Sequence, residues 1–330
     1  MSRREFISFL GGAVVWPFAV RAQITTNVQR VGILDVSTAG GYSDQHYWKA
    51  FRDHMRTLGY VEGTNVEFDA RWANGNGAAL PGLTTELLRL PVRVIVALST
   101  PVAQAAKSVT SELPIVVPLM ADPVGVGLVA SLARLGGNVT GLSTISAELS
   151  AKRLELLREI VPNLSRAAII WPESNPPFAL TVRHTQIASQ SLGVALRVVG
   201  VHAARDFEKA AAELAAGQVQ GVIVAVPAGS FASTDLAQLT AILAHQRLPA
   251  IYSEKEYVHA GGLVSYGPDY PNLFRQAATY TDKILRGMQP ADLPVEQPTK
   301  FESAINHKTA LALGLNVPPP LLAIADEMIE

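Results

Sequence analysis

The chain contains no cysteine. It therefore has no disulfide, no Cys-based zinc site, no thiol nucleophile and no N-terminal cysteine to carry a lipid. Neither sign of charge dominates, because 27 Lys and Arg residues stand against 28 Asp and Glu residues. A balanced charge of this kind does not recruit nucleic acid or an anionic membrane surface.

The sequence also lacks the compact motifs of common enzymes. It has no HExxH pair, no GxSxG nucleophile elbow, no phosphate-binding loop and no complete GxGxxG. Its seven histidines do not pair at ligand spacing with a third carboxylate. The charged run Glu254-Lys255-Glu256 is interpreted as a solvated face rather than a catalytic pair. We therefore expect no catalytic residue, no metal and no cofactor.

Long apolar runs are missing apart from one near the N-terminus. Arg3 and Arg4 stand in a twin-arginine-like export motif, and the apolar run 9–20 follows, broken by glycines and a proline. Small residues around Arg21 suit cleavage before Gln23. We expect residues 1–22 to be a signal peptide, by either the twin-arginine or the general secretory route. The mature protein is then exported to the periplasm, soluble and not lipid-anchored.

The remaining chain alternates strand and helix patterns, which is typical of parallel α/β sheets. The alternation restarts near residue 145, so we expect two sheets of similar build. A short helix is expected within 124–141, a strand at 262–266, and a terminal helix at 321–329. The proline-bounded segment 290–294 is expected to cross between the two domains.

The stretch 94–107 shows the expected unit most clearly. Five apolar residues, 94–98, predict a buried strand, and Thr100 and Pro101 suit the N-cap and first residue of a helix. The carboxyl edge of a parallel sheet and a helix N-terminus favour an anionic ligand. Thr100 either only caps the helix or, with Ser99, also binds the negatively charged end of a small molecule.

Small polar residues recur at the expected strand ends of both halves. Their recurrence favours ligand contact over simple capping, because two such edges facing one cleft explain it. Tyr42, Trp171, Tyr252 or Tyr266 would serve an apolar or cationic part of the ligand. The candidate ligand-binding residues are Thr38, Ser99, Thr100 and Asp122 in the first half, and Ser174, Asn175, Ser230, Tyr252 and Ser253 in the second.

Several motifs, in order along the chain, resemble the ABC transporter substrate-binding protein family that includes tryptophan and phenylalanine binders. They are GYVEGxN at 59–65, Arg71-Trp72, DPVG at 122–125, GGNVTG at 136–141, KRLELL at 152–157, AGGLxSYG at 260–267, PADLPVE at 290–296 and the ending ADExIE. Pro227 to Ala237 departs from the pattern of the aromatic amino-acid binders.

The resemblance implies a type I periplasmic-binding-protein fold, with two doubly wound parallel-sheet lobes joined by a hinge. We expect lobe I to comprise 28–143 and 262–292, and lobe II 144–261 and 293–330. Similar amino-acid binders hold the ligand carboxylate with hydroxyls that here would be Ser99 and Thr100, helped by the loop at Asp122. The implied role is import of an amino acid or small carboxylate by a monomer that docks on an inner-membrane permease with a separate ATPase.

Three other roles share this scaffold. A sensory ligand-binding subunit would bind in the same manner and signal to a membrane receptor. An enzyme on the same two lobes would turn over its ligand. A lactose-repressor-type regulator would need an N-terminal helix-turn-helix, which the sequence does not suggest.

Overall fold

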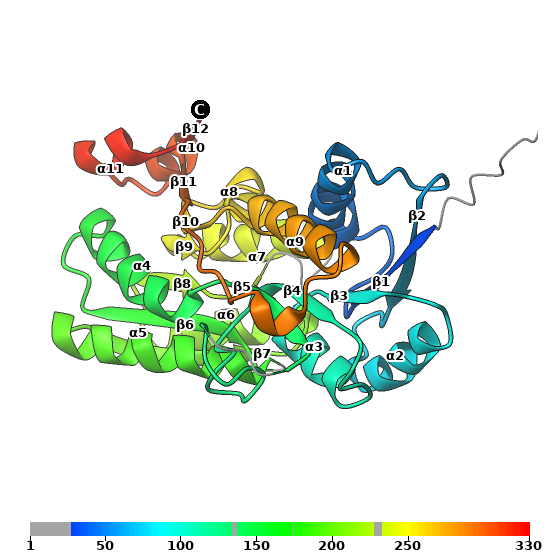
Figure 1. Cartoon of the computed structure of the whole chain (residues 1–330). Helices are drawn as coiled ribbons and strands as arrows, with labels where there is room; N and C mark the ends of the chain where they lie inside the picture. Colours follow the sequence, from blue (N-terminus) through cyan, green and yellow to red (C-terminus); the bar gives the residue numbers. More distant parts are fainter. Residues whose placement is uncertain (1–27, 134–136, 174, 228–232) are drawn as a thin grey trace, which may run out of the picture.

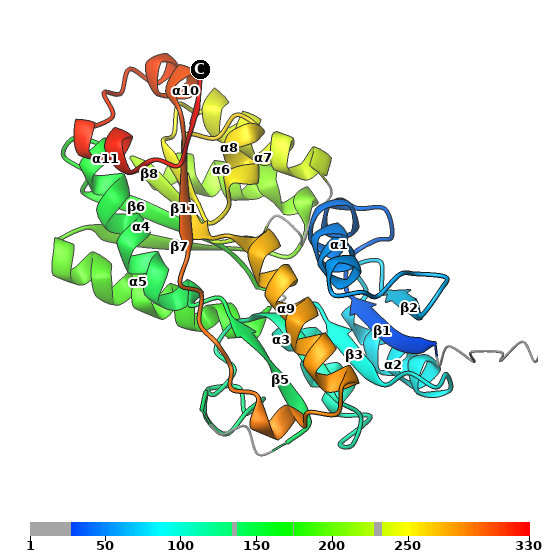
Figure 2. The same cartoon turned by 45° about the horizontal axis from the view of Figure 1, so that its top comes forward.

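A computed structural model describes residues 28–133, 137–173, 175–227 and 233–330. The expected signal peptide, Ser174 and Ser230 lie outside these ranges. The described chain forms two α/β lobes, each built on its own sheet (Figures 1 and 2). The expected fold class of two parallel-sheet α/β lobes is confirmed.

The first sheet has the strand order β2-β1-β3-β4-β5, and all its neighbours are parallel. Its central strand β3 is buried along its whole length, as the run of apolar residues predicts. Each fully buried valine or isoleucine there contributes about 2 kcal/mol. The strands are β1 (Gln29–Asp35), β2 (Val66–Trp72), β3 (Val94–Ala97), β4 (Ile115–Met120) and β5 (Val139–Ser143).

Helices cover both faces of this sheet (Figure 1). On one face lie the π-helix η1 (Ser43–Trp48), α1 (Lys49–Thr57) and α9 (Tyr270–Leu285), and α9 arrives from far along the chain. On the other face lie η2 (Gly77–Ala79), α2 (Leu80–Leu88) and α3 (Thr100–Lys107). The short segment η6 (Pro290–Asp292) lies at the edge beside β5.

The second sheet has the order β12-β11-β10-β9-β8-β6-β7, and only the pair β10–β11 is antiparallel. Alternate residues of β6 face opposite cores, as a strand buried on both sides requires. The strands are β6 (Arg166–Pro172), β7 (Ala195–Val201), β8 (Gly221–Val224), β9 (Ala250–Tyr252), β10 (Val264–Pro268), β11 (Phe301–Asn306) and β12 (Glu327–Ile329).

The second sheet is also covered on both faces. One face carries α4 (Ser146–Ile160), η3 (Pro176–Phe178), α5 (Ala179–Leu192), α10 (His307–Ala312) and α11 (Pro319–Ile324). The other carries η4 (Ala204–Asp206), α6 (Phe207–Ala216), α7 (Ser233–His245) and α8 (Lys255–His259). In the described ranges, none of these helices has the length and apolar character needed to span a membrane.

The chain passes between the sheets three times: after β5, between β10 and α9, and before β11. We expected the chain to return to the first lobe at residue 262, but it returns only after β10. Strand β10 pairs with β9 and β11 in the second sheet, and α9 is the element that packs on the first sheet. We also expected the chain to cross at 290–294. The segment around Glu296 still pairs with β5 of the first sheet, so the last crossing comes after it.

Two local expectations were wrong. The described part of 124–141 forms turns and strand β5 instead of a short helix. The end of the chain is not a single helix, because β12 pairs with β11. There the backbone N–H of Ser303 donates to the carboxylate of Asp326, and the N–H of Asp326 donates to the carbonyl of Ser303. These two hydrogen bonds hold the chain beside β11 at the point where β12 begins.

Candidate functional site

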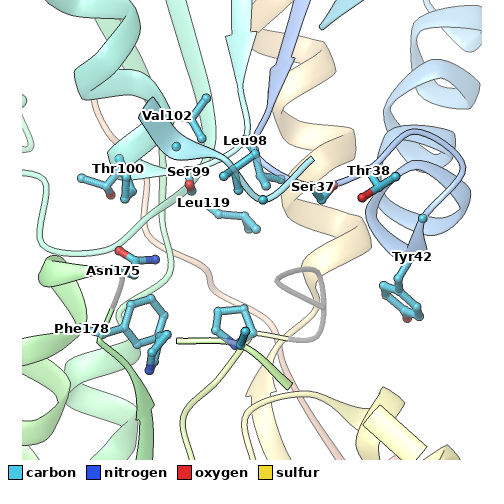
Figure 3. A pocket seen from close by; sticks show the side chains of 18 of the residues that line it. Ser37, Thr38, Tyr42, Leu98, Ser99, Thr100, Val102, Leu119, Asn175 and Phe178 are labelled. Atoms are coloured by element: carbon cyan, nitrogen blue, oxygen red, sulfur yellow. The ribbon is translucent and has the colours of Figure 1, made fainter. Parts of the chain in front are cut away.

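A cavity of about 980 Å³ lies between the two lobes. The carboxyl ends of β1, β3 and β4 face it from the first lobe, and the segments after β6, β7 and β8 face it from the second. Figure 3 shows Ser99, Thr100 and Leu119 on one side of the cavity, and Asn175 and Phe178 on the opposite side. This is the position at which open α/β sheets bind ligands.

The first wall is built on the turn between β3 and α3. The helix begins at Thr100 and its cap is Ser99, one residue earlier than expected, because Ser99 has the extended backbone (φ −151°) of a cap. The Ser99 side chain makes no capping hydrogen bond. Its hydroxyl and the N-terminus of α3 are therefore available to an anionic group.

Thr100 has a different role in this wall. Its hydroxyl donates to the carbonyl of Ala121 and accepts from the N–H of the same residue, both at 2.9 Å. The side chain is buried, with 1% of its surface exposed. Thr100 thus ties the start of α3 to the end of β4 and fixes the shape of the wall.

The loop after β1 carries Thr38 and Tyr42 to the cavity (Figure 3). Fully buried Asp35 anchors this loop. Its carboxylate accepts hydrogen bonds from the backbone N–H of Ser37 (2.7 Å), the hydroxyl of Ser43 (2.8 Å) and the indole N–H of Trp48 (2.6 Å). Burial raises the pKa of Asp35 in spite of these bonds.

The second wall presents Asn175 and Phe178. The Oδ1 atom of Asn175 is buried and has no hydrogen-bond partner among the described residues. A buried acceptor without a partner is unfavourable until a donor reaches it. A ligand with an N–H or O–H group at this place would supply that donor.

The loop after β7 brings charge to the cavity through His202 and Arg205. Asp206 holds the loop by accepting the backbone N–H groups of His202 (2.7 Å) and Ala203 (3.1 Å), and these bonds lower its pKa. His202 lies near Glu173 and Asp206, whereas Arg205 forms no ion pair within the described ranges. Arg205 is thus a cation available at the edge of the cavity.

Aromatic rings close the side of the cavity nearest the crossings. Tyr42, Tyr47 and Tyr270 line it together with Phe178 of the second wall. Tyr47 stacks on Tyr270 with 6.0 Å between ring centroids and meets Tyr42 edge to face at 5.4 Å. The cavity therefore joins a polar edge to an aromatic surface, which suits a ligand with one polar and one apolar end.

The expected residues thus fall into three groups. Thr38, Ser99, Thr100 and Asn175 line the cavity together, and so does Tyr42. Asp122 lies on a separate small cavity of about 120 Å³, where its Oδ1 accepts the N–H of Gly125 at 3.0 Å. Ser174 and Ser230 belong to the part of the chain that the structure does not describe.

Tyr252 and Ser253 lie in the interior away from the cavity. Tyr252 stacks on Tyr257 at 4.8 Å, and burial raises its pKa. Neighbouring strand β10 covers the end of β9, since a Cβ atom on Gly267 would lie 1.9 Å from the carbonyl oxygen of Ser253. Trp171 and Tyr266, offered for the apolar part of a ligand, are partly buried and pack against the core of the second lobe, and neither lines the cavity.

Several residues that line the cavity were not predicted from the sequence. The loop 74–77, Asn-Gly-Asn-Gly, follows β2 at the same sheet edge, and its turn composition after a strand was a usable signal. His202 and Arg205 follow β7 in the same manner. Phe178 and Tyr270 had no local signal, because each reaches the cavity only through the packing of the two lobes. Within the described ranges, no three His, Asp or Glu side chains gather as metal ligands would.

Comparison with known proteins gives concordant results. The family model described as "ABC transporter substrate binding protein" matches residues 40–329. A protein of Clostridioides difficile (strain R20291) named "Tyrosine-binding protein" is 27% identical over 268 residues, which are 81% of this chain and 76% of that protein.

Two solved structures share the fold over nearly the whole chain. A conserved domain protein of Vibrio cholerae O1 biovar El Tor has a TM-score of 0.84 and 26% identity, covering 91% of this chain and 99% of its own. An ABC domain from Streptococcus pneumoniae, in complex with L-Trp, has a TM-score of 0.83 and 24% identity, covering 92% and 100%.

Proposed function

The chain belongs to the family of ABC transporter substrate-binding proteins, and from that premise we propose that it is the extracytoplasmic solute-binding component of an ABC importer. Its family and the similar proteins are binding proteins, and we propose no catalytic role. In this role the chain works in the periplasm and delivers its ligand to an inner-membrane permease whose ATPase is a separate chain.

The ligand class that we propose is an amino acid or related small carboxylate, with an apolar or aromatic side chain. The observation that carries this proposal is the placement of Ser99 and the N-terminus of α3 opposite Asn175, beside an aromatic surface. In the proposed pose the carboxylate accepts hydrogen bonds from the first wall. The amino group or another donor meets the Oδ1 of Asn175, and the side chain packs on Phe178 and the tyrosines.

Binding in this pose uses both lobes at once. A ligand that contacts both walls stabilises the arrangement in which they face each other, by its differential affinity for that arrangement. The permease would then recognise the closed form. The names of two similar proteins, which refer to tyrosine and L-Trp, support a ligand of this size.

Thermal unfolding with a panel of ligands tests the proposal. We expect L-tyrosine, L-tryptophan, L-phenylalanine, L-leucine or benzoate to raise the midpoint, because a ligand at 100 times its Kd stabilises the folded state by about 2.7 kcal/mol. Isothermal titration then gives the Kd of each active compound. A panel that leaves the midpoint unchanged and gives no heat of binding would contradict the proposed ligand class.

A further inference from the structure

The charged run Glu254-Lys255-Glu256 is not a solvated face in the structure. Glu254 follows β9 of the second lobe and is 2% exposed. Its carboxylate accepts a hydrogen bond from the hydroxyl of Tyr47, which lies on η1 of the first lobe. The bond therefore joins the two lobes directly, outside the three crossings of the chain.

A second buried charged group of the second lobe is Arg153 on α4. Arg153 is 1% exposed, and its Nε donates to the carbonyl of Tyr266 at 2.7 Å. Burial lowers the pKa of Arg153, and Glu254 is among the groups whose negative charge partly opposes this effect. The second lobe thus presents a buried carboxylate to the first lobe.

A second tyrosine, Tyr42, lies beside the first and meets its ring edge to face. Burial, followed by the charge of Glu256, raises the pKa of Tyr42 above its ordinary value. Burial and the charge of Glu254 do the same for Tyr47, so both phenols stay protonated, and that of Tyr47 donates to Glu254. Both tyrosines line the ligand cavity, and the hydroxyl of Tyr47 reaches Glu254 of the opposite lobe.

We propose that Tyr47 and Glu254 form a clasp that holds the two lobes together and fixes the aromatic side of the cavity. In this clasp Glu254 is a positioning residue, because it acts on the ligand through the ring of Tyr47. The clasp rests on the proposed function in one respect, which is that closure of the lobes serves to capture a ligand. It does not depend on which ligand is bound.

The distance between the lobes in the ligand-free full-length chain tests the clasp. Because cysteine is absent, Arg89→Cys on the first lobe and Lys209→Cys on the second accept two spin labels and no others. Both sites are exposed, at the end of α2 and on α6. Pulsed electron spin resonance then gives the short and long distances of the closed and open forms.

We expect Tyr47→Phe to reduce the ratio of short to long distances about tenfold, as loss of a hydrogen bond to a charged group does. Glu254→Gln should have a similar effect, and the double variant should lose no more than the larger single effect, because both changes remove one interaction. Since Glu254→Gln also removes a negative charge that acts on buried Arg153, Tyr47→Phe is the primary variant, and circular dichroism checks that each variant folds.

Tyr60→Phe is the matched control. The hydroxyl of Tyr60 donates to Asp282 on α9 at 2.9 Å, and both residues belong to the first lobe. This change removes the same kind of bond without touching the contact between lobes, so the distance ratio should not change. A wild-type chain with only the long distance, or a Tyr47→Phe chain with the wild-type ratio, would overturn the clasp.

Titration of wild type and variants with L-tyrosine as the probe separates this inference from the proposed function. If L-tyrosine binds, we expect Tyr47→Phe to raise its Kd about tenfold and Tyr60→Phe to leave it unchanged; an unchanged Kd in Tyr47→Phe would count against the clasp. If no amino acid of the panel binds the wild type, the proposed ligand class fails, while the ligand-free distance ratio still decides the clasp.

Discussion

The first lobe lines the cavity with hydroxyls, amides and apolar side chains, whereas the described lining of the second lobe includes His202, Arg205 and Asp235. The first wall is also held from within, by buried Asp35 and by the bonds between Thr100 and Ala121. The loop that carries Arg205 is held by Asp206, whose carboxylate is partly exposed. The comparison indicates an uncharged wall that is held by buried hydrogen bonds, opposite a charged wall that is held by hydrogen bonds nearer the surface.

The largest effect is expected from Asp35→Ala in the first lobe. The change leaves three buried donors without an acceptor, so the free energy of unfolding should fall by about 3 kcal/mol. Urea unfolding measures it. Asp206→Ala in the second lobe is the matched comparison, and it should lower the free energy of unfolding by less than Asp35→Ala does, because its carboxylate is partly exposed. Equal losses in both variants would show that the two walls are held equally firmly.

The pH dependence of stability should differ in sign between these two carboxyls. Burial raises the pKa of Asp35, so the folded state binds more protons than the unfolded one above about pH 4, and its contribution falls as pH rises through that window. Hydrogen bonds from His202 and Ala203 lower the pKa of Asp206, whose contribution is lost as pH falls below about 4. Urea unfolding of wild type, Asp35→Asn and Asp206→Asn between pH 3 and 7 measures both slopes, and slopes of the same sign would contradict this assignment.

The sequence predicted the first wall better than the second because the first depends on local patterns. The apolar run before Ser99 and the proline after Thr100 determine both strand β3 and the start of α3. The cap was misplaced by one residue, since the backbone angles of Ser99, which the residue types do not specify, decide it.

The second wall depends on contacts distant in sequence. Tyr252 and Ser253 do end a strand, as expected, but β10 and the crossing that follows cover that end. Likewise β12 exists only because β11 lies beside it, about 20 residues earlier in the chain. The residues at a strand end do not determine whether that end stays exposed to the cavity. A neighbouring strand and a crossing segment, both distant in sequence, decide it.

Within the first wall, Thr100→Ala separates structure from ligand contact. The change leaves the N–H and carbonyl of Ala121 without their partner, so the free energy of unfolding should fall by about 2 kcal/mol. Thr100→Ser keeps the hydroxyl and should restore most of the loss. Ser99→Ala removes no capping bond, so it should leave stability within about 0.5 kcal/mol of wild type and weaken binding of L-tyrosine.

Urea unfolding and isothermal titration on the same samples measure both effects. If Ser99→Ala binds L-tyrosine as the wild type does, the anchor for the carboxylate lies elsewhere on the first wall. If Thr100→Ala keeps wild-type stability, the bonds to Ala121 do not hold the wall, and the contrast between the lobes weakens.

Across the cavity, Asn175→Ala should affect binding alone. Its Oδ1 has no partner among the described residues, so stability should not fall, whereas the Kd for L-tyrosine should rise about tenfold with the loss of one buried hydrogen bond to a charged donor. Gln190→Ala, an exposed amide on α5, is the control and should bind as the wild type does. An unchanged Kd in Asn175→Ala would remove the second wall from the proposed pose.

The smallest effect is expected from Arg205→Gln, and it tests what the charge of the second wall is for. A guanidinium open to solvent is screened by salt, so the Kd for L-tyrosine should rise about threefold at 10 mM salt and not at all at 300 mM. Arg89→Gln, on the first lobe outside the cavity, should change neither value.

A different outcome is that Arg205→Gln raises the Kd for a dicarboxylic ligand such as L-glutamate by more than about threefold at both salt concentrations. That result would change the comparison between the two walls. It would mean that Arg205 pairs with a second acidic group inside the closed cavity, where water and salt no longer screen the interaction. The uncharged wall would then anchor the carboxylate common to all ligands, and the charged wall would select among their side chains. Salt dependence measured for both ligands distinguishes general attraction at the entrance from selection within the site.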